Sequence, residues 1–229
     1  MFPVYSVTHV PGLYLYNDST SRLDQYVLTD IDVEGSQIYL DLNTTPAYDH
    51  PVVGLKVGDV LVISNTNGIA VGTVTEVLTN GEVRLAANDT LGLNQGEAGF
   101  GNIKSITSPP DPPDFPPTYA KRIHIVSYYI DASDPDSTRL MRQVSAHPPV
   151  PVAENVVDLQ LTYDIFDDIT EAGAADLPDA GSSLNQIRKI NISLAIRSSA
   201  ESLLDRNFQR IHLTTSVGPR NLTFRDRYQ

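Results

Sequence analysis

The chain lacks cysteine and tryptophan, and it is poor in basic residues. The absence of cysteine from 229 residues excludes disulfides, thiolate zinc sites and cysteine nucleophiles together. The formal net charge is −12, because 16 Lys and Arg face 28 Asp and Glu. A field of this sign repels nucleic acid and anionic lipid surfaces, so we expect neither as a partner. No apolar run approaches the roughly 20 residues that cross a bilayer, and the first residues do not resemble a signal peptide.

The composition that remains is typical of a turn-rich β protein. Hydrophobic residues make up 41% of the chain and charged residues only 19%, with 14 Gly and 16 Pro. Enough apolar residues are present to build a packed core, so disorder is not expected. The length allows one large β domain or two small ones.

A proline-rich segment at residues 107–118 is the clearest boundary along the chain. Six of its residues are proline, and they cannot enter a helix or a central strand. We therefore predict an N-terminal β-rich region at 1–106, an extended connector at 107–118, and a C-terminal β domain at 119–229.

The N-terminal region reads as short strands joined by tight turns. Alternating or continuous apolar runs predict strands at 37–42, 59–64, 70–77 and 83–85. Asn80-Gly81 between the last two runs is a strong hairpin signal. Because the strands are short and closely spaced, we expect a small barrel-like unit at about 50–95.

The C-terminal region has longer strand patterns. Residues 157–163 and 190–196 alternate apolar with polar side chains, and strands are also predicted at 122–130, 139–144 and 211–217. Residues 198–208 form the only plausible helix of this region, with Ser199 as its N-cap. The predicted fold class is mainly β: an antiparallel sheet or sandwich with little helix.

A search of the reactive residue types finds no catalytic pattern. The histidines are scattered along the chain, and the motifs of zinc proteases, serine hydrolases and phosphate-binding loops are absent. We therefore predict a protein that is not an enzyme, with no catalytic residues and no bound organic cofactor. The five histidines are His9, His50, His124, His147 and His212.

One acidic cluster has the chemistry of a metal site. Asp131, Asp134 and Asp136 lie in the loop between two predicted strands, and carboxylates on a flexible loop are ligands that Ca²⁺ accepts. The spacing is not that of an EF-hand, so a solvated hairpin tip is the plainer interpretation. Calcium at these three residues is the metal site that we predict. A second acidic cluster, Asp164, Asp167 and Asp168 followed by Glu171, has the same plainer interpretation as a solvated loop.

The order of motifs in the C-terminal half resembles a known family. A strand ending in Tyr128-Tyr129 is followed by Leu140-Met-Arg-Gln-Val144, then by residues 152–163 (VAENVVDLQLTY) and 187–197 (IRKINISLAIR), and the end carries Leu213 to Val217 with Arg220-Asn221. This order resembles the PilW-type minor pilins of type IV pilus systems and, more distantly, the J-type minor pseudopilins of type II secretion. It covers about residues 55–225, most specifically 122–197.

The resemblance implies a β-rich, pilin-like head carried on an N-terminal hydrophobic helix. In the family that helix follows a leader cut by a peptidase and packs into the filament core. It also implies other pilin subunits as partners and a place in the cell envelope, periplasmic or extracellular. The sequence shows neither the leader nor the helix, so we expect the anchor on a preceding segment or on a separate chain.

Two other functions fit the same composition. One is an adhesion module that binds carbohydrate or a surface; the chain has 11 tyrosines, although they form no recognisable row. The other is a structural protein of a phage or virion. Both would be mainly β and non-enzymatic.

Overall fold

The computed structural model describes residues 4–9, 25–43, 47–94, 103–107, 118–167, 172–176, 187–204 and 206–218. Strands dominate these residues, and every ladder whose register is resolved is antiparallel, which confirms the mainly β prediction. None of the described helical segments is long and apolar enough to span a membrane. The chain divides into two compact units: the N-terminal unit (Tyr5–Ser127 with Gln143–Pro149) and the C-terminal unit (Met1–Val4, Tyr128–Arg142 and Val150–Gln229).

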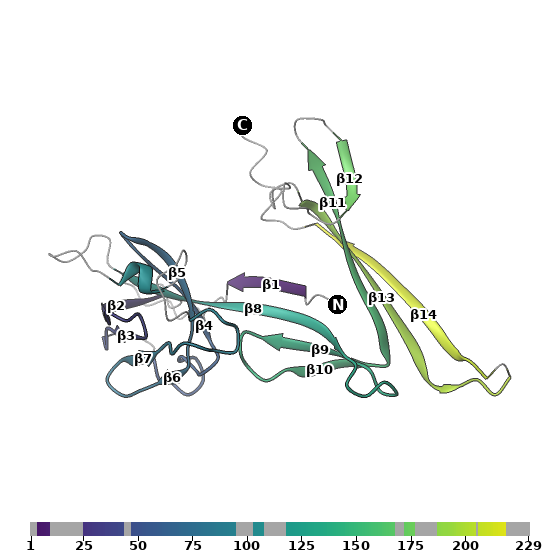
Figure 1. The fold of residues 1–229 in the computed structure, drawn as a ribbon, viewed down its shortest axis with the longest axis horizontal. Coiled ribbons are helices and arrows are strands. Elements are labelled where there is room, and N and C mark those ends of the chain that lie inside the picture. Colours follow the sequence, from purple (N-terminus) through teal and green to yellow (C-terminus); the bar gives the residue numbers. More distant parts are fainter. Residues whose placement is uncertain are drawn as a thin grey trace. The chain divides into compact units, whose positions relative to one another are not determined.

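Short strands form the sheet of the N-terminal unit, with the start of β8 at its centre (Figure 1). One flank of β8 pairs with β2, which continues through β3 and β7 to β6, and the other pairs with the β4–β5 hairpin. The strands are β1 (Val4–His9), β2 (Gln25–Ile31), β3 (Gln37–Leu40), β4 (Val60–Asn65), β5 (Gly68–Thr73), β6 (Glu76–Val77), β7 (Glu82–Arg84) and β8 (Tyr119–Asp131). A 3-10 helix, η1 (Ile103–Ile106), packs against β5 and β4.

An apolar cluster of described residues fills the core of this unit. Alternate side chains of β3, β4 and β7 point inward, as the period of two requires. Ile38, Leu61, Ile63 and Val83 are completely buried, and Ile103 of η1 packs with them.

No closed barrel forms among the described residues, and the core reaches beyond the expected 50–95. β4 pairs with β8 and β7 pairs with β3, so strands from 25–40 and from 119–123 complete the sheet. The chain passes from β5 to β6 through Val74 and Thr75, where one ladder ends and the next begins. Short strands so close in sequence could not bury their inner faces alone.

The Asn80-Gly81 hairpin forms as predicted. Both residues have positive φ, 61° and 80°, as a type I′ turn requires, and β6 and β7 pair across it. A Cβ at Gly81 would lie 2.6 Å from the carbonyl oxygen of Leu40, so only glycine fits.

A four-stranded antiparallel sheet, in the order β12-β11-β13-β14, makes up most of the C-terminal unit (Figure 1). Its strands are β11 (Val156–Asp167), β12 (Ala172–Asp176), β13 (Ile187–Glu201) and β14 (Phe208–Val217). Two further strands, β9 (Arg139–Val144) and β10 (Val150–Glu154), pair with each other, and β9 also pairs with β8.

The helix predicted at 198–208 is wrong. β13 continues to Glu201, and β14 begins at Phe208, so the segment is the end of a β-hairpin. The Ser198 hydroxyl holds the two strands together here, because it accepts a hydrogen bond from the Gln209 backbone N–H. Leu203 and Leu204 in the turn are 100% and 99% exposed, so a helix here would have had no core to bury its apolar face.

The division into units falls elsewhere than the predicted division at 107–118. β8 starts in the sheet of the N-terminal unit and crosses into the C-terminal unit after Ser127. Most of the predicted connector, residues 108–117, lies outside the described residues.

Candidate functional site

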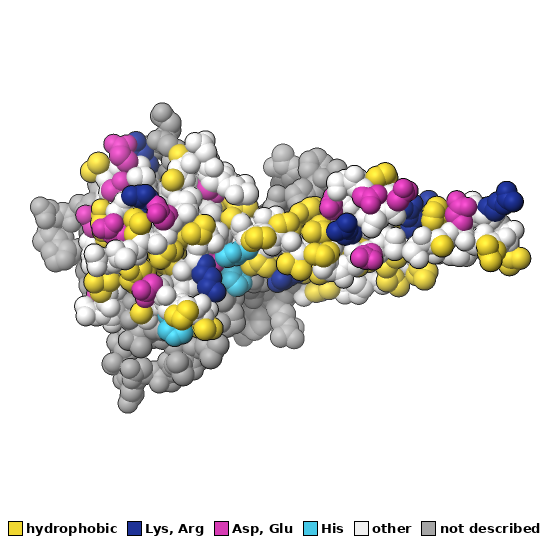
Figure 2. Space-filling model, turned by 90° about the horizontal axis from the view of Figure 1, so that it is seen from below, with side chains coloured by type: hydrophobic (Ala, Val, Ile, Leu, Met, Phe, Trp, Pro, Cys, Tyr) yellow, Lys and Arg dark blue, Asp and Glu magenta, His cyan; other side chains and the backbone are white. Residues whose placement is uncertain are grey.

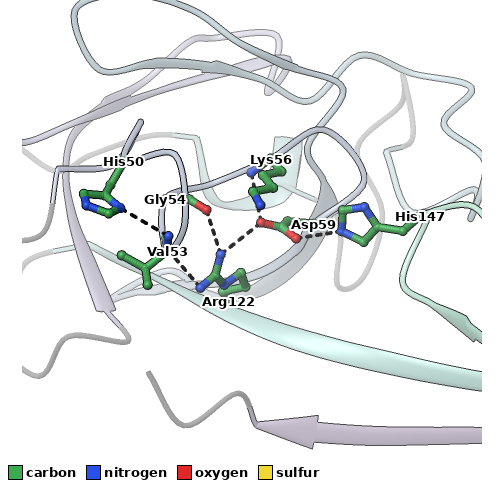
Figure 3. A network of polar contacts seen from close by, with 7 residues as sticks. All are labelled: His50, Val53, Gly54, Lys56, Asp59, Arg122 and His147. Carbon is green, nitrogen blue, oxygen red and sulfur yellow. Dashed lines mark hydrogen bonds and ion pairs between the residues drawn. The ribbon is translucent and has the colours of Figure 1, made fainter. Parts of the chain in front are cut away.

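A network of polar contacts in the N-terminal unit centres on the buried carboxylate of Asp59 (Figure 3). Its Oδ2 accepts hydrogen bonds from the Lys56 backbone N–H at 3.0 Å and from Arg122 Nη1 at 3.2 Å. Its Oδ1 lies 2.9 Å from His147 Nε2. The side chains of Asp59, Arg122 and His147 are 5%, 19% and 31% exposed.

Local backbone structure places these groups. Asp59 precedes β4 and closes a turn, since its own N–H donates to the carbonyl of Lys56. Gly58, with φ +93°, lets the chain approach the turn after β9, where the Ala146 N–H donates to the Gly58 carbonyl at 3.0 Å. This contact brings His147 to Asp59.

Arg122 of β8 connects the network to the loop before β4. Its guanidinium donates to the carbonyls of Gly54 and Val53 at 2.9 and 3.1 Å, in addition to Asp59. The ring of His50 accepts hydrogen bonds from the Val53 N–H (Figure 3) and from the Val52 N–H, and so shapes the same loop. Arg122 therefore neutralises a buried carboxylate and saturates two loop carbonyls.

The chemistry of this network is that of a structural ion pair. A histidine oriented by a carboxylate supplies two of the three members of a nucleophilic triad, but the contacts described for His147 include no hydroxyl group that it could activate. Burial raises the pKa of the nearby Tyr26 phenol above its usual 10.0, with the charge of Arg122 lowering it and that of Asp59 raising it. The network thus joins the 53–59 loop, β8 and the turn after β9.

All residues of the acidic loop predicted as a calcium site lie within the described part of the chain. The Asp131 carboxylate accepts a hydrogen bond from the Ser133 N–H, and Asp134 accepts one from the Asp136 N–H. The hydrogen bonds from Ser133 hold the pKa of Asp131 below its usual value. No cluster of three acidic or histidine side chains among the described residues is arranged to hold a metal ion.

Calcium at Asp131, Asp134 and Asp136 remains a prediction that a melting experiment can decide. A bound ion stabilises the folded chain by mass action, so millimolar Ca²⁺ must raise the melting temperature over that in EDTA. Asp134→Asn must then abolish the increase. An unchanged melting temperature in Ca²⁺ would remove the site.

The second candidate site is a face of the four-stranded sheet. Opposite residues in register share a face, and four rungs across β11, β13 and β14 are apolar at every position but Thr215. The rungs are Val156–Ile196–Ile211, Leu159–Leu194–Leu213, Leu161–Ile192–Thr215 and Tyr163–Ile190–Val217. We call this surface the apolar face.

The apolar face is only partly covered. Val156 is buried, but the other rung residues of β11 and β13 are only half-buried, and on β14 Ile211, Leu213 and Val217 are 62%, 52% and 51% exposed. Core side chains of the N-terminal unit, by contrast, are completely buried. Hydrophobic side chains also reach the surface, beside Lys and Arg, at the right-hand end of Figure 2, where Figure 1 places the β13–β14 turn. A sheet with one apolar face is stabilised when a second layer packs on it.

The opposite face of the same sheet is polar. Asp164 of β11 accepts a hydrogen bond from Asn191 of β13 at 2.7 Å and lies 3.4 Å from Lys189. A hollow on this face is lined by hydroxyl and carboxamide side chains, together with Ile192 and Thr215, which lie between them along β13 and β14. The polar lining residues are Gln160, Thr162, Asn191, Ser193, Thr214 and Ser216.

Comparison with known proteins does not extend these observations. No family model matches the chain, and no curated protein and no solved structure shows significant similarity to it.

Sequence reasoning missed the Asp59 network because its members are far apart in the chain. Asp59 lies 63 residues from Arg122 and 88 from His147, and no local pattern connects them. The one feature of the network that the sequence shows is a charged residue, Asp59, directly before an apolar strand. The apolar face, in contrast, follows from the predicted alternation in 157–163 and 190–196, except that a register shift after Val156 places Val156 instead of Val157 opposite Ile196.

Proposed function

We propose that this chain is the β head of a filament subunit, a minor pilin or minor pseudopilin of a type IV pilus-like system. It acts in assembly through contacts with other pilin subunits in the cell envelope. Two observations support the proposal: the order of motifs over residues 122–197, and the partly covered apolar face of the sheet formed by β11, β12, β13 and β14. The apolar face carries the argument, because it leaves room for a further layer.

An amphipathic or apolar helix is the second layer that the proposal requires. A helix lying on β11, β13 and β14 would cover side chains such as Leu194 and Leu213, which are half-buried or exposed. Each aliphatic side chain that becomes covered contributes about 1 kcal/mol or more. The helix belongs to the same polypeptide or to a partner subunit, and it anchors the head in the filament.

Filaments sheared from cells of the source organism test the proposal. The chain should be found in the purified filament fraction by mass spectrometry, and deletion of its gene should reduce the number of filaments seen by electron microscopy. Restoring the gene should restore them. A chain absent from the filament fraction, with filaments unchanged by the deletion, would contradict the proposal.

The polar hollow favours a second candidate function, binding of a neutral carbohydrate. Hydroxyl and carboxamide groups such as those of Thr162, Asn191 and Ser216 both donate and accept hydrogen bonds, as sugar hydroxyls do. A glycan array with the purified chain tests this. Saturable binding that Asn191→Ala removes would support it, and an array without saturable hits would eliminate it.

A further inference from the structure

Among the described strands, β14 has a neighbour on one side only. It ends the four-stranded sheet, and every one of its residues is exposed. Residues 210–217 pair with β13 without a bulge, and the strand contains no proline or lysine. Bulges, prolines and lysines usually keep natural edge strands from pairing with another chain, because a regular edge offers its free backbone groups to such a chain.

The direction of each backbone N–H in β14 follows from the register. The Gln209 N–H donates to Ser198 of β13, so in an alternating strand the odd-numbered residues point toward β13. Arg197 agrees, since its N–H donates to Asn155, away from β14. The N–H groups of Arg210, His212, Thr214 and Ser216 therefore point outward from the sheet.

Two arginines lie opposite each other on the polar side of this edge. Arg197 and Arg210 are register partners, and like charges in that position destabilise a sheet. Arg197 donates to the carbonyls of Pro135 and Asp136 and lies 4.6 Å from the centroid of the Phe208 ring, but no carboxylate among the described residues pairs with either arginine. Arg210 is exposed, so an acidic side chain of a partner can reach its guanidinium.

We infer that the β14 edge takes an extended strand from a partner protein, and that this strand carries an acidic side chain beside Arg210. Its backbone pairs with the outward N–H and carbonyl groups of β14. Its alternate apolar side chains extend the apolar face next to Ile211, Leu213 and Val217. The inference rests on the proposed function only in naming a neighbouring filament subunit as the source of the strand.

A synthetic probe peptide tests the strand addition without any filament. The probe has about eight residues, with Val at alternate positions, Thr at the others, one Glu among the threonines and a Lys at each end. Amide exchange followed by NMR should show slower exchange at Arg210, His212, Thr214 and Ser216 when the probe is added to the full chain. Absence of this alternating protection at saturating probe would overturn the inference.

Thr214 supplies a matched pair of variants. Thr214→Pro removes an outward N–H, which an edge strand tolerates, and it should weaken probe binding about tenfold. Thr214→Ala keeps the N–H and should bind as the wild type does. If Thr214→Pro fails to fold, a probe methylated at its edge-facing amides replaces it; equal binding of methylated and plain probe would also overturn the inference.

The charge complementarity is tested by a double-mutant cycle. Replacing the probe's Glu by Gln should weaken binding several-fold to the wild type and leave binding to Arg210→Gln unchanged. An equal loss of affinity for both proteins would show that the probe's Glu does not contact Arg210. These outcomes do not depend on the filament experiment, so either proposal can fail alone.

Discussion

Asp59 joins three segments of the N-terminal unit through one carboxylate. It is almost fully buried and receives hydrogen bonds from the backbone of Lys56 and the side chain of Arg122, with His147 within hydrogen-bonding distance. A buried charge is costly unless it is paired, so the arrangement is stable only while both Asp59 and Arg122 are present. The charge is satisfied within the unit, which is why we assign it to structure.

Removing the charge of Asp59 should destabilise the chain strongly. Asp59→Asn leaves the guanidinium of Arg122 without its counterion in a largely buried position, so the free energy of unfolding should fall by about 3 kcal/mol. Urea denaturation measures this. Asp49→Asn is the control, because Asp49 is exposed and should change stability little. An Asp59→Asn variant as stable as the wild type would refute the structural role of Asp59.

Tyr26 predicts a pH dependence at the alkaline end. Burial raises the pKa of its phenol above the usual 10.0, so near that pH the unfolded chain loses the proton before the folded chain does. The stability that this confers is complete below pH 10 and is lost as the pH rises through the folded-state pKa. Between pH 9 and pH 11 the free energy of unfolding of Tyr26→Phe should therefore fall less than that of the wild type, as measured by urea denaturation. Parallel curves of unfolding free energy against pH would contradict a raised pKa of Tyr26.

Among the elements, the β6–β7 hairpin is the one most completely specified by its local sequence. Asn80 and Gly81 have positive φ, and the Gly81 position allows no Cβ because of the Leu40 carbonyl. Turn chemistry and tertiary packing thus favour the same residue. This agreement is why the hairpin could be predicted from the sequence.

Gly81→Ala should be destabilising by about 2 kcal/mol. The alanine would have to adopt a left-handed conformation and displace the β3 backbone. Gly218→Ala is the matched control, since among the described residues a Cβ there would meet the Arg188 carbonyl oxygen at 3.8 Å, an ordinary van der Waals distance. Thermal melts of the two variants compare them directly, and equal melting temperatures would rule out strain at Gly81.

Prediction from sequence succeeded where the local pattern and the tertiary environment agree. The alternation around Leu159 and Ile192 predicted β11 and β13, and β9 has the predicted bounds Arg139–Val144. It failed at 198–208, where helix propensity was overridden by the β13–β14 ladder. β10 was missed because Pro151 is unfavourable in a strand, yet β10 ends its sheet, where proline is tolerated.

At the scale of the whole molecule, the two units differ in how they bury apolar side chains. The N-terminal unit encloses its own core, with Ile38 and Leu61 completely buried, whereas the sheet of the C-terminal unit leaves the apolar face half-exposed. Pairing of distant strands such as β3 with β7 and β4 with β8 could not be read from the sequence, because nothing local determines which strands meet. This contrast supports the proposal that the chain assembles through its C-terminal unit.

The most direct test of this account places a charge on each face of β13 in turn. Leu194 lies on the apolar face and Ser193 on the polar face, so Leu194→Lys and Ser193→Lys add the same charge to opposite sides of one strand. We predict that, in a deletion strain, the Ser193→Lys gene restores filaments and the Leu194→Lys gene does not, although both purified chains melt as the wild type does within a few degrees. Full restoration of filaments by Leu194→Lys would contradict the account.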